Sequence, residues 1–144
     1  ELELLKRYLD LEKLRFSDKF DYAISIDEQI DTDALQIPNM LIQPHLENAI
    51  WHGLRYKETK GMLQLSFLLH ENLLIVKIED NGIGLEKSKL LKTKNQQVHK
   101  SIGLSNTQNR ITLLNELYHK NIVCKITELQ EPNQGTVVKI SFDI

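Results

Sequence analysis

The order in which helical and strand-like patterns follow one another most constrains the fold of this chain. Apolar residues recur at helical spacing over 1–17, and they alternate with polar residues from Lys19 to Asp27. Beyond that point the patterns predict a helix, two strands, a long loop, a helix and two strands, over 38–54, 62–69, 73–79, 80–100, 101–118, 122–129 and 136–144. Strands that come in pairs, without regular alternation with helices, disfavour a doubly wound parallel sheet. We therefore predict an α/β two-layer sandwich, with a mixed, mainly antiparallel five-stranded sheet and helices on one face.

One proline complicates the predicted helix over 38–54. Pro38 stands near its first position, where a proline is well tolerated. Pro44 lies inside the pattern, and an interior proline removes a backbone hydrogen bond and kinks a helix. This helix therefore either bends at Pro44 or begins later.

Composition places the chain among ordinary globular domains. Its 144 residues suffice for one domain, the formal net charge is −2, and Lys and Arg are spread along the chain, which does not indicate a nucleic-acid surface. The single cysteine, Cys124, excludes an internal disulfide and a multi-cysteine metal site, and we expect it to be a small core residue. The apolar runs are too short to span a bilayer and no signal peptide is present. The chain opens at Glu1 inside a helical pattern, so we expect a piece of a longer protein, from which a membrane region could have been removed.

Two segments carry polar groups suited to a nucleotide. Asp80 follows an apolar strand and precedes Gly82 and Gly84, so a carboxylate able to accept from an exocyclic amine stands beside backbone that can approach a ligand closely. On the predicted helix over 38–54, Asn48 and His52 share a face, and an amide oxygen suits magnesium, which takes few protein ligands. Taken singly, the first segment is equally the sequence of a plain turn, and the second that of a solvated helix face.

Two further segments involve glycine. Gly103 stands near the predicted helix start at Ser101, where unpaired N–H groups and the helix dipole favour a phosphate. Gly135 and Thr136 open the last strand. An ordinary capped helix and an ordinary turn are the alternative interpretations.

Together, these four segments resemble the ATPase family of gyrase, Hsp90, histidine kinases and MutL, whose fold is named after Bergerat, in its N, G1, G2 and G3 boxes. Within it, IPNMLIQPHLENAIWHG (37–53) and IGLSNTQNRI (102–111) look like the LytS-type sensor histidine kinases. The leading segment ELELLKRYLDLEKLRFSDKF (1–20) also resembles what enters that catalytic domain. The resemblance covers nearly the whole chain. It implies residues 1–18 as the end of a dimerisation helix and 19–144 as the catalytic domain.

The resemblance also implies the cofactors, ATP and Mg2+, and roles for the matching residues. Asn48 would coordinate magnesium, Asp80 would bind the adenine amine, and Thr136 would support Asp80 and an ordered water. Gly82 and Gly84 would shape the pocket floor.

A mobile lid is implied over about 85–100, and Gly103 and Leu104 would end it near the phosphates. His52, one turn from Asn48, would line the phosphate side of the pocket. Many relatives carry Lys or Arg at the position of Trp51, so Lys57 or a lid lysine would have to replace that phosphate contact.

The resemblance further implies transfer of the ATP γ-phosphoryl group to a histidine and then to a response regulator. The acceptor motif Asn-Pro-His-Phe is not in this sequence, so we expect the acceptor on a separate dimerisation segment, in a homodimeric full-length protein. The domain would be the cytoplasmic part of an inner-membrane bacterial sensor. Hydrolysing relatives carry a general-base Glu where this chain has Pro44, which argues against ATP hydrolysis. The alternatives are a degenerate docking or dimerisation module, an anti-sigma-type serine kinase, and an ATPase of the same superfamily.

Overall fold

The computed structural model describes residues 2–17, 19–38, 41–84, 94–129 and 134–143, with backbone alone for 94–105. The helices and strands follow the chain in the order α1 (Leu2–Arg15), β1 (Phe20–Ile26), α2 (Gln43–His52), the short 3-10 helix η1 (Leu54–Tyr56), β2 (Gly61–His70), β3 (Leu73–Asp80), α4 (Lys94–Tyr118), β4 (Val123–Glu128) and β5 (Thr136–Asp143). In this described part of the chain, no helix is long and apolar enough to cross a membrane.

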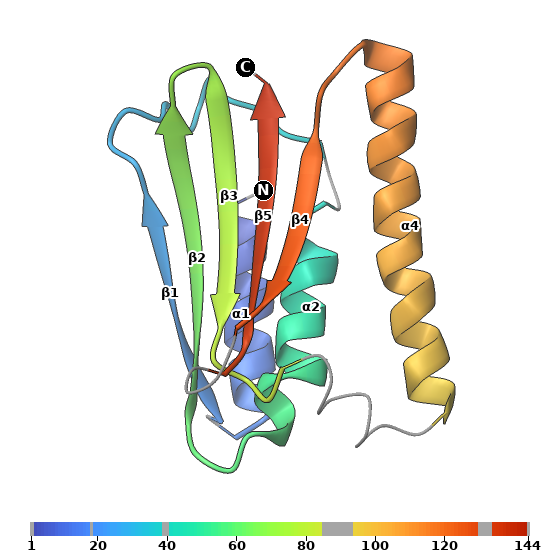
Figure 1. Cartoon of the computed structure of the whole chain (residues 1–144). Coiled ribbons are helices and arrows are strands. Elements are labelled where there is room, and N and C mark those ends of the chain that lie inside the picture. The colour runs from blue at the N-terminus through green and yellow to red at the C-terminus, as the bar shows by residue number, and fades with distance from the viewer. Residues whose placement is uncertain (1, 18, 39–40, 85–93, 130–133, 144) are drawn as a thin grey trace.

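The five strands form one sheet in the order β1-β2-β3-β5-β4 (Figure 1). β1 runs parallel to β2, whereas β2–β3, β3–β5 and β4–β5 are antiparallel. The turn between β2 and β3 has two residues, and its first, Glu71, has a φ of 54°, as tight hairpins require. The prediction of a mixed, mainly antiparallel sheet is confirmed.

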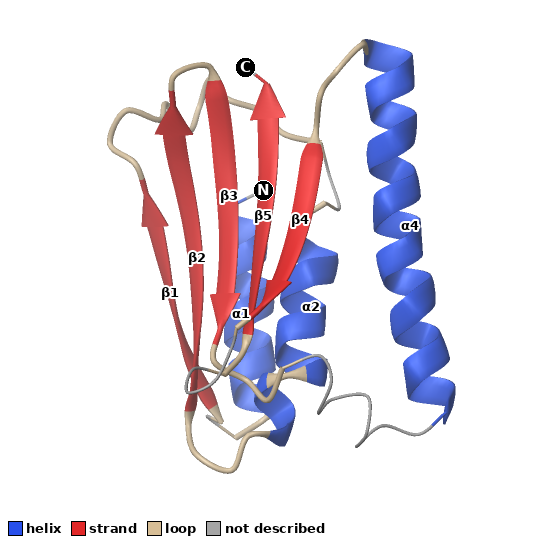
Figure 2. Cartoon of the chain, viewed as in Figure 1, coloured by secondary structure: helices blue, strands red, loops and turns tan. Residues whose placement is uncertain are grey.

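α1 and α2 lie on one side of this sheet, which gives the two layers that the sequence predicts, and α4 stands alongside β4 in the view of Figure 2, in contact with α2. Alternate residues of the strands are buried toward α1 and α2, as the two-residue period of a strand dictates. Leu5 and Leu9 of α1 and Leu46 and Ile50 of α2 complete the same core. The division of the chain at residue 18 therefore runs between parts that share one core, and it stays a prediction.

Two predicted helix starts differ from the structure. The second helix begins at Gln43 and not at Pro38, which is the later start that Pro44 left open, and Pro44 as its second residue costs no interior hydrogen bond. The last helix begins at Lys94 and not at Ser101, so 94–100 is helical and not part of a loop. That segment has helix-forming Lys and Gln and no Gly or Pro, which lets the helix extend without an apolar stripe. Gly103 consequently lies inside the helix, and Ser101 does not cap it.

Candidate nucleotide-binding site

A small cavity of about 50 Å3 lies between α2 and the ends of three strands. Its walls come from α2 and the residue after it, from the end of β3 and its loop, and from β4 and β5: His45, Asn48, Ala49, His52, Gly53, Ile78, Asp80, Gly84, Ile126, Thr136 and Val138. Five of the residues predicted from the sequence to bind nucleotide are therefore together: Asn48, His52, Asp80, Gly84 and Thr136. They are spread over 89 positions of the chain, so the fold itself assembles this set.

Asp80 is positioned by the register of two neighbouring strands. It is the last residue of β3 and pairs with Thr136, the first residue of β5. The side chain is almost completely buried, with the residue 4% exposed, and its Oδ1 accepts a hydrogen bond of 2.9 Å from the backbone N–H of Gly82. A carboxylate held in this way has a fixed orientation, which a group that recognises a planar base needs.

The residue after Asp80 fastens the loop to the sheet. The Asn81 side-chain oxygen accepts a 2.7 Å hydrogen bond from the Met62 N–H, and the Asn81 N–H donates to the Met62 carbonyl oxygen at 3.3 Å. Asn81 thus satisfies both backbone groups of one β2 residue. Sequence patterns alone assign Asn81 no separate role, because only the pairing with β2 supplies its partners.

Two glycines permit backbone contacts that a side chain would block. A Cβ on Gly82 would lie 2.5 Å from the carbonyl carbon of Gly53, so the loop after β3 touches the chain just beyond α2. Gly135 has a φ of +127°, and a Cβ there would lie 1.9 Å from the carbonyl oxygen of Asp80. The loop, α2 and the start of β5 can therefore approach one another only with glycine at these positions.

One face of α2 supplies the remaining polar groups. The spacing of His45, Asn48 and His52 predicts a common face, and all three line the cavity. The His45 residue is 3% exposed, and its burial lowers the pKa of the imidazole to about 4, so it is neutral near pH 7. Its Nε2 lies 3.7 Å from the Sγ of Cys124, and burial raises the pKa of that thiol. The sequence-based set of nucleotide-binding residues omitted His45, although its helical spacing from Asn48 was the available signal.

Trp51 points elsewhere. Its ring packs edge-on against Phe16, with centroids 5.1 Å apart, and the Arg15 guanidinium lies 4.5 Å from the ring centroid. The Arg55 guanidinium lies over the same ring at 5.5 Å. Trp51 therefore joins α2 to the end of α1 and does not line the cavity.

Several predicted contributors are not in this cavity. Gly82 lies beside it and orients Asp80, and Lys57 is not among its lining residues. Gly103 and Leu104 lie on the backbone of α4 at positions whose side chains are outside the described part. Of the predicted lid, residues 85–93, including Lys87, Lys89 and Lys92, also lie outside the described residues.

The chemistry of the lining suits a nucleotide with a magnesium ion. Ile78, Ile126 and Val138 offer apolar contact to a flat base, and the Asp80 carboxylate can accept from an amino group. Asn48 offers a hard amide oxygen, and magnesium completes its six ligands with waters and phosphate oxygens, so a cluster of protein acids is not required.

Comparison with known proteins identifies relatives of the same kind. Sensor protein LytS of Oceanobacillus iheyensis is 32% identical over 96% of this chain, and sensor histidine kinase YpdA of Escherichia coli is 34% identical over 79%. Sensor protein kinase HptS of Staphylococcus aureus is 28% identical over 96%. The chain spans 23%, 20% and 26% of the lengths of these three relatives. No family model matches the chain.

Solved structures agree in fold. The mycobacterial sensor histidine kinase MprB superposes with a TM-score of 0.61 at 14% identity, covering 99% of this chain and 93% of that one. The catalytic domain of the histidine kinase ThkA gives 0.57 at 12% identity, covering 98% and 91%. The structural similarity covers more than nine-tenths of each matched chain and shows the fold, whereas the sequence relatives indicate the LytS type. The homologues of this chain are LytS-type sensor histidine kinases, and the chain has the fold of a histidine kinase catalytic domain.

Proposed function

We propose that this chain binds ATP with magnesium and transfers the γ-phosphoryl group to a histidine outside the 144 residues, from which it passes to an aspartate of a response regulator. The observation that carries the proposal is the buried Asp80 carboxylate, which shares one cavity with Asn48, His52 and Thr136. The kinase relatives favour this function over a docking module, an anti-sigma-type serine kinase or an ATPase.

Each group has a distinct part in the proposal. Asp80 accepts from the adenine amine, and Thr136, its partner across the β3–β5 register, supports the carboxylate and a water. Asn48 holds the magnesium ion, His52 faces the phosphates one turn further along α2, and Gly103 and Leu104 approach the phosphates from α4. Magnesium, when bound, neutralises charge on the phosphates. A histidine acceptor is already a nucleophile when neutral, so the protein's own contribution is positioning and charge stabilisation.

The size of the cavity bears on how ATP enters. At about 50 Å3 it is smaller than an adenine base, so we expect its walls to separate when a nucleotide binds. Ile126 of β4 is 40% exposed and Asp80 is 4% exposed. We therefore expect Ile126 to yield while Asp80 stays in place.

The wider assembly follows the relatives. We infer that the full-length protein is a homodimeric bacterial sensor, with this domain on the cytoplasmic side of the inner membrane and the acceptor histidine on its dimerisation segment. Nucleic acid is not among the partners we propose.

Calorimetric titration of ATP, with and without magnesium, tests the proposal. The Asp80→Asn variant keeps an oxygen that can accept from Gly82 but loses the carboxylate, so the turn is preserved while the adenine contact weakens. We expect affinity to fall about 10- to 150-fold, the worth of a hydrogen bond to a charged group. Glu79→Gln is the matched control, because Glu79 is the preceding β3 residue and pairs with Lys77 away from the cavity. Absence of heat from folded wild-type protein at millimolar ATP would refute the proposal.

A further inference from the structure

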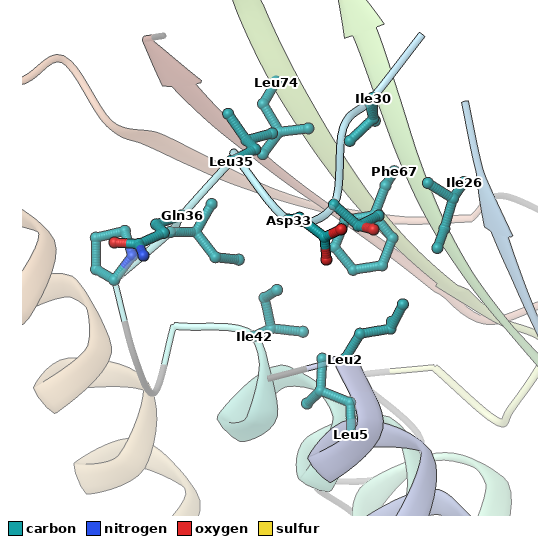
Figure 3. Close-up of a pocket in the computed structure, with 13 residues that line it drawn as sticks. Leu2, Leu5, Ile26, Ile30, Asp33, Leu35, Gln36, Ile42, Phe67 and Leu74 are labelled. Carbon is teal, nitrogen blue, oxygen red and sulfur yellow. The ribbon is translucent and has the colours of Figure 1, made fainter. Parts of the chain in front are cut away.

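A second and much larger pocket, of about 570 Å3, lies where the loop between β1 and α2 crosses the start of α1. Leu5, Ile42 and Leu74 are buried, and Figure 3 shows Leu74 across the pocket from Leu5 and Ile42. Further apolar side chains come from four segments of the chain: Leu2, Ile26, Ile30, Leu35, Ile37, Pro38 and Phe67. Its volume lies within the range of 300–1,000 Å3 that is typical of small-molecule sites. The two cavities share no lining residue among the described parts of the chain.

The loop that forms one wall is held in place by its own hydrogen bonds. The two carboxylate oxygens of Asp27 accept from the N–H groups of Gln29 at 3.1 Å and Leu69 at 3.3 Å, which ties the loop to β2. Further along, Asp31 Oδ1 accepts from the Asp33 N–H at 3.0 Å. The pocket is therefore formed before a ligand arrives, which lowers the entropic cost of binding.

The charge at its rim has one sign. Thr32, Asp33 and Gln36 are exposed at the rim, and Asp33 carries the one formal charge among the described lining residues. Figure 3 shows the Asp33 side chain extending among the apolar ones, with Ile30 on one side of the pocket and Leu2 on the other. Residues 27–33 contain four carboxylates, and residues 20–54 contain no Lys or Arg. Half-buried apolar side chains beside an acidic group favour a ligand that has an apolar body and a positive charge.

We propose that this pocket binds a small amphipathic cation, an alkylammonium or arylalkylamine, whose apolar body lies against the half-buried side chains of Ile30, Leu35 and Phe67 and whose protonated amine pairs with Asp33. The nucleotide cavity takes an anion that carries magnesium, so the two sites select ligands of opposite charge. This proposal does not depend on the proposed function.

The test titrates hexyl-, octyl- and decylammonium into the whole 144-residue chain, by calorimetry and by methyl NMR. Each added CH2 that is buried strengthens binding about fourfold, so affinity rises steadily along the series if the chain enters the pocket. Methyl shifts are expected at Ile30 and Ile42, and not at Ile126, which lines the nucleotide cavity. Octyl sulfate, with the same body and the opposite charge, binds more weakly than octylammonium.

Two variants separate charge from volume. Asp33→Asn weakens octylammonium about two- to fivefold, the range for an exposed ion pair, while Glu28→Gln, an exposed carboxylate of the same loop that does not line the pocket, has no effect. Leu35→Trp fills the pocket from the loop and abolishes binding. Thermal unfolding shows whether Leu35→Trp is folded, and the methyl shifts of the wild-type chain decide the question where it is not.

Three results would overturn the proposal. Equal binding of octylammonium and octyl sulfate, with Asp33→Asn unchanged, would remove the role of charge. Binding of a basic amphipathic peptide, with no shift from any alkylammonium, would assign the pocket to a protein partner. A concentration-dependent dimer that shifts the Ile30 and Ile42 methyls would assign it to a second copy of the chain.

Discussion

The two cavities along this chain differ in how their walls are made. The larger one, about 570 Å3, has a wall formed by a loop that hydrogen bonds to aspartate side chains hold in place, and a single charge at its rim. The smaller one, about 50 Å3, gathers a carboxylate, an amide and two imidazoles on walls whose positions follow from strand register and glycine contacts. The larger cavity thus has few groups that can bind a ligand specifically, whereas the smaller one has several. We therefore expect the surroundings of the small cavity to tolerate substitution poorly at the glycines where backbone segments touch, and the loop wall of the larger cavity to tolerate it well.

The strongest test of this contrast compares a substitution at Gly135, beside the small cavity, with one at Leu35, in the wall of the larger cavity. Gly135→Ala combines a positive φ with a Cβ 1.9 Å from the Asp80 carbonyl oxygen, so we expect a loss of about 3 kcal/mol or more in the free energy of unfolding. Leu35→Ala, in the half-buried loop of the larger pocket, should cost about 1 kcal/mol. Urea denaturation measures both. Equal losses would mean that the two walls are equally rigid.

Acid should weaken the wall of the small cavity. The His45 pKa is lowered from its ordinary 6.5 to about 4, so between these values the unfolded chain binds a proton that the native protein does not. The contribution of neutral His45 to the free energy of unfolding is therefore fully present above pH 6.5. It is lost as the pH falls toward 4, and amounts to at most about 3 kcal/mol at 1.36 kcal/mol per pKa unit. Unfolding curves for wild type and His45→Leu at several pH values should converge in acid. His70→Gln, at an exposed position, is the control, and a wild-type pH profile identical to that of His45→Leu would contradict the prediction.

Trp51 lines neither cavity, so its substitution tests whether the contact between α1 and α2 affects ATP binding. Trp51→Ala removes the edge contact with Phe16 and the stacking of Arg15, and we expect a loss of about 2 kcal/mol in stability. Since Trp51 does not line the nucleotide cavity, ATP affinity of the folded variant should match that of wild type. Trp51→Phe, which keeps a ring, should recover most of the stability. A fall in ATP affinity for both variants would show that the α1–α2 contact reaches the site.

The smallest effect on stability is expected at Asn48. Asn48→Ala places the best helix former on a half-buried helix position, so stability should change by less than about 1 kcal/mol. ATP titrations should nevertheless lose their dependence on magnesium, because the proposed metal ligand is gone. Gln43→Ala, earlier on the same helix and outside the cavity, should keep that dependence. Retention of it in Asn48→Ala would remove the metal role of this residue.

Much of the fold follows from local patterns. The strands of both predicted pairs alternate in part or run apolar, and the loop after Asp80 has the glycines that its geometry needs. The start of α4 could not be found in this way, because residues 94–100 favour a helix through propensity and show no apolar period. Nothing in the sequence alone fixes β1 as a parallel neighbour of β2, since parallel pairing connects segments far apart in the chain.

The candidate site divides along the same line. Asp80 and Asn48 carry signals that can be seen in single segments, a carboxylate before two glycines and a polar helix face. The contact of His45 with Cys124 joins residues 79 positions apart and arises only from packing. From the sequence, Trp51 stands where many relatives have a basic residue that contacts phosphate. The orientation of α2 instead places its ring against Phe16 at the end of α1.

The contact between Gly82 and Gly53 has a consequence for anyone who redesigns this domain. Because their backbones touch, and the Ile83 N–H donates to the Gly53 carbonyl oxygen at 3.4 Å, the loop after β3 and the end of α2 are held together as one rigid unit. A library that varies the two segments separately would mostly produce combinations in which the two backbones clash. Exchange of residues 43–54 and 80–84 together, from one other kinase, would preserve the close backbone contact between the two segments.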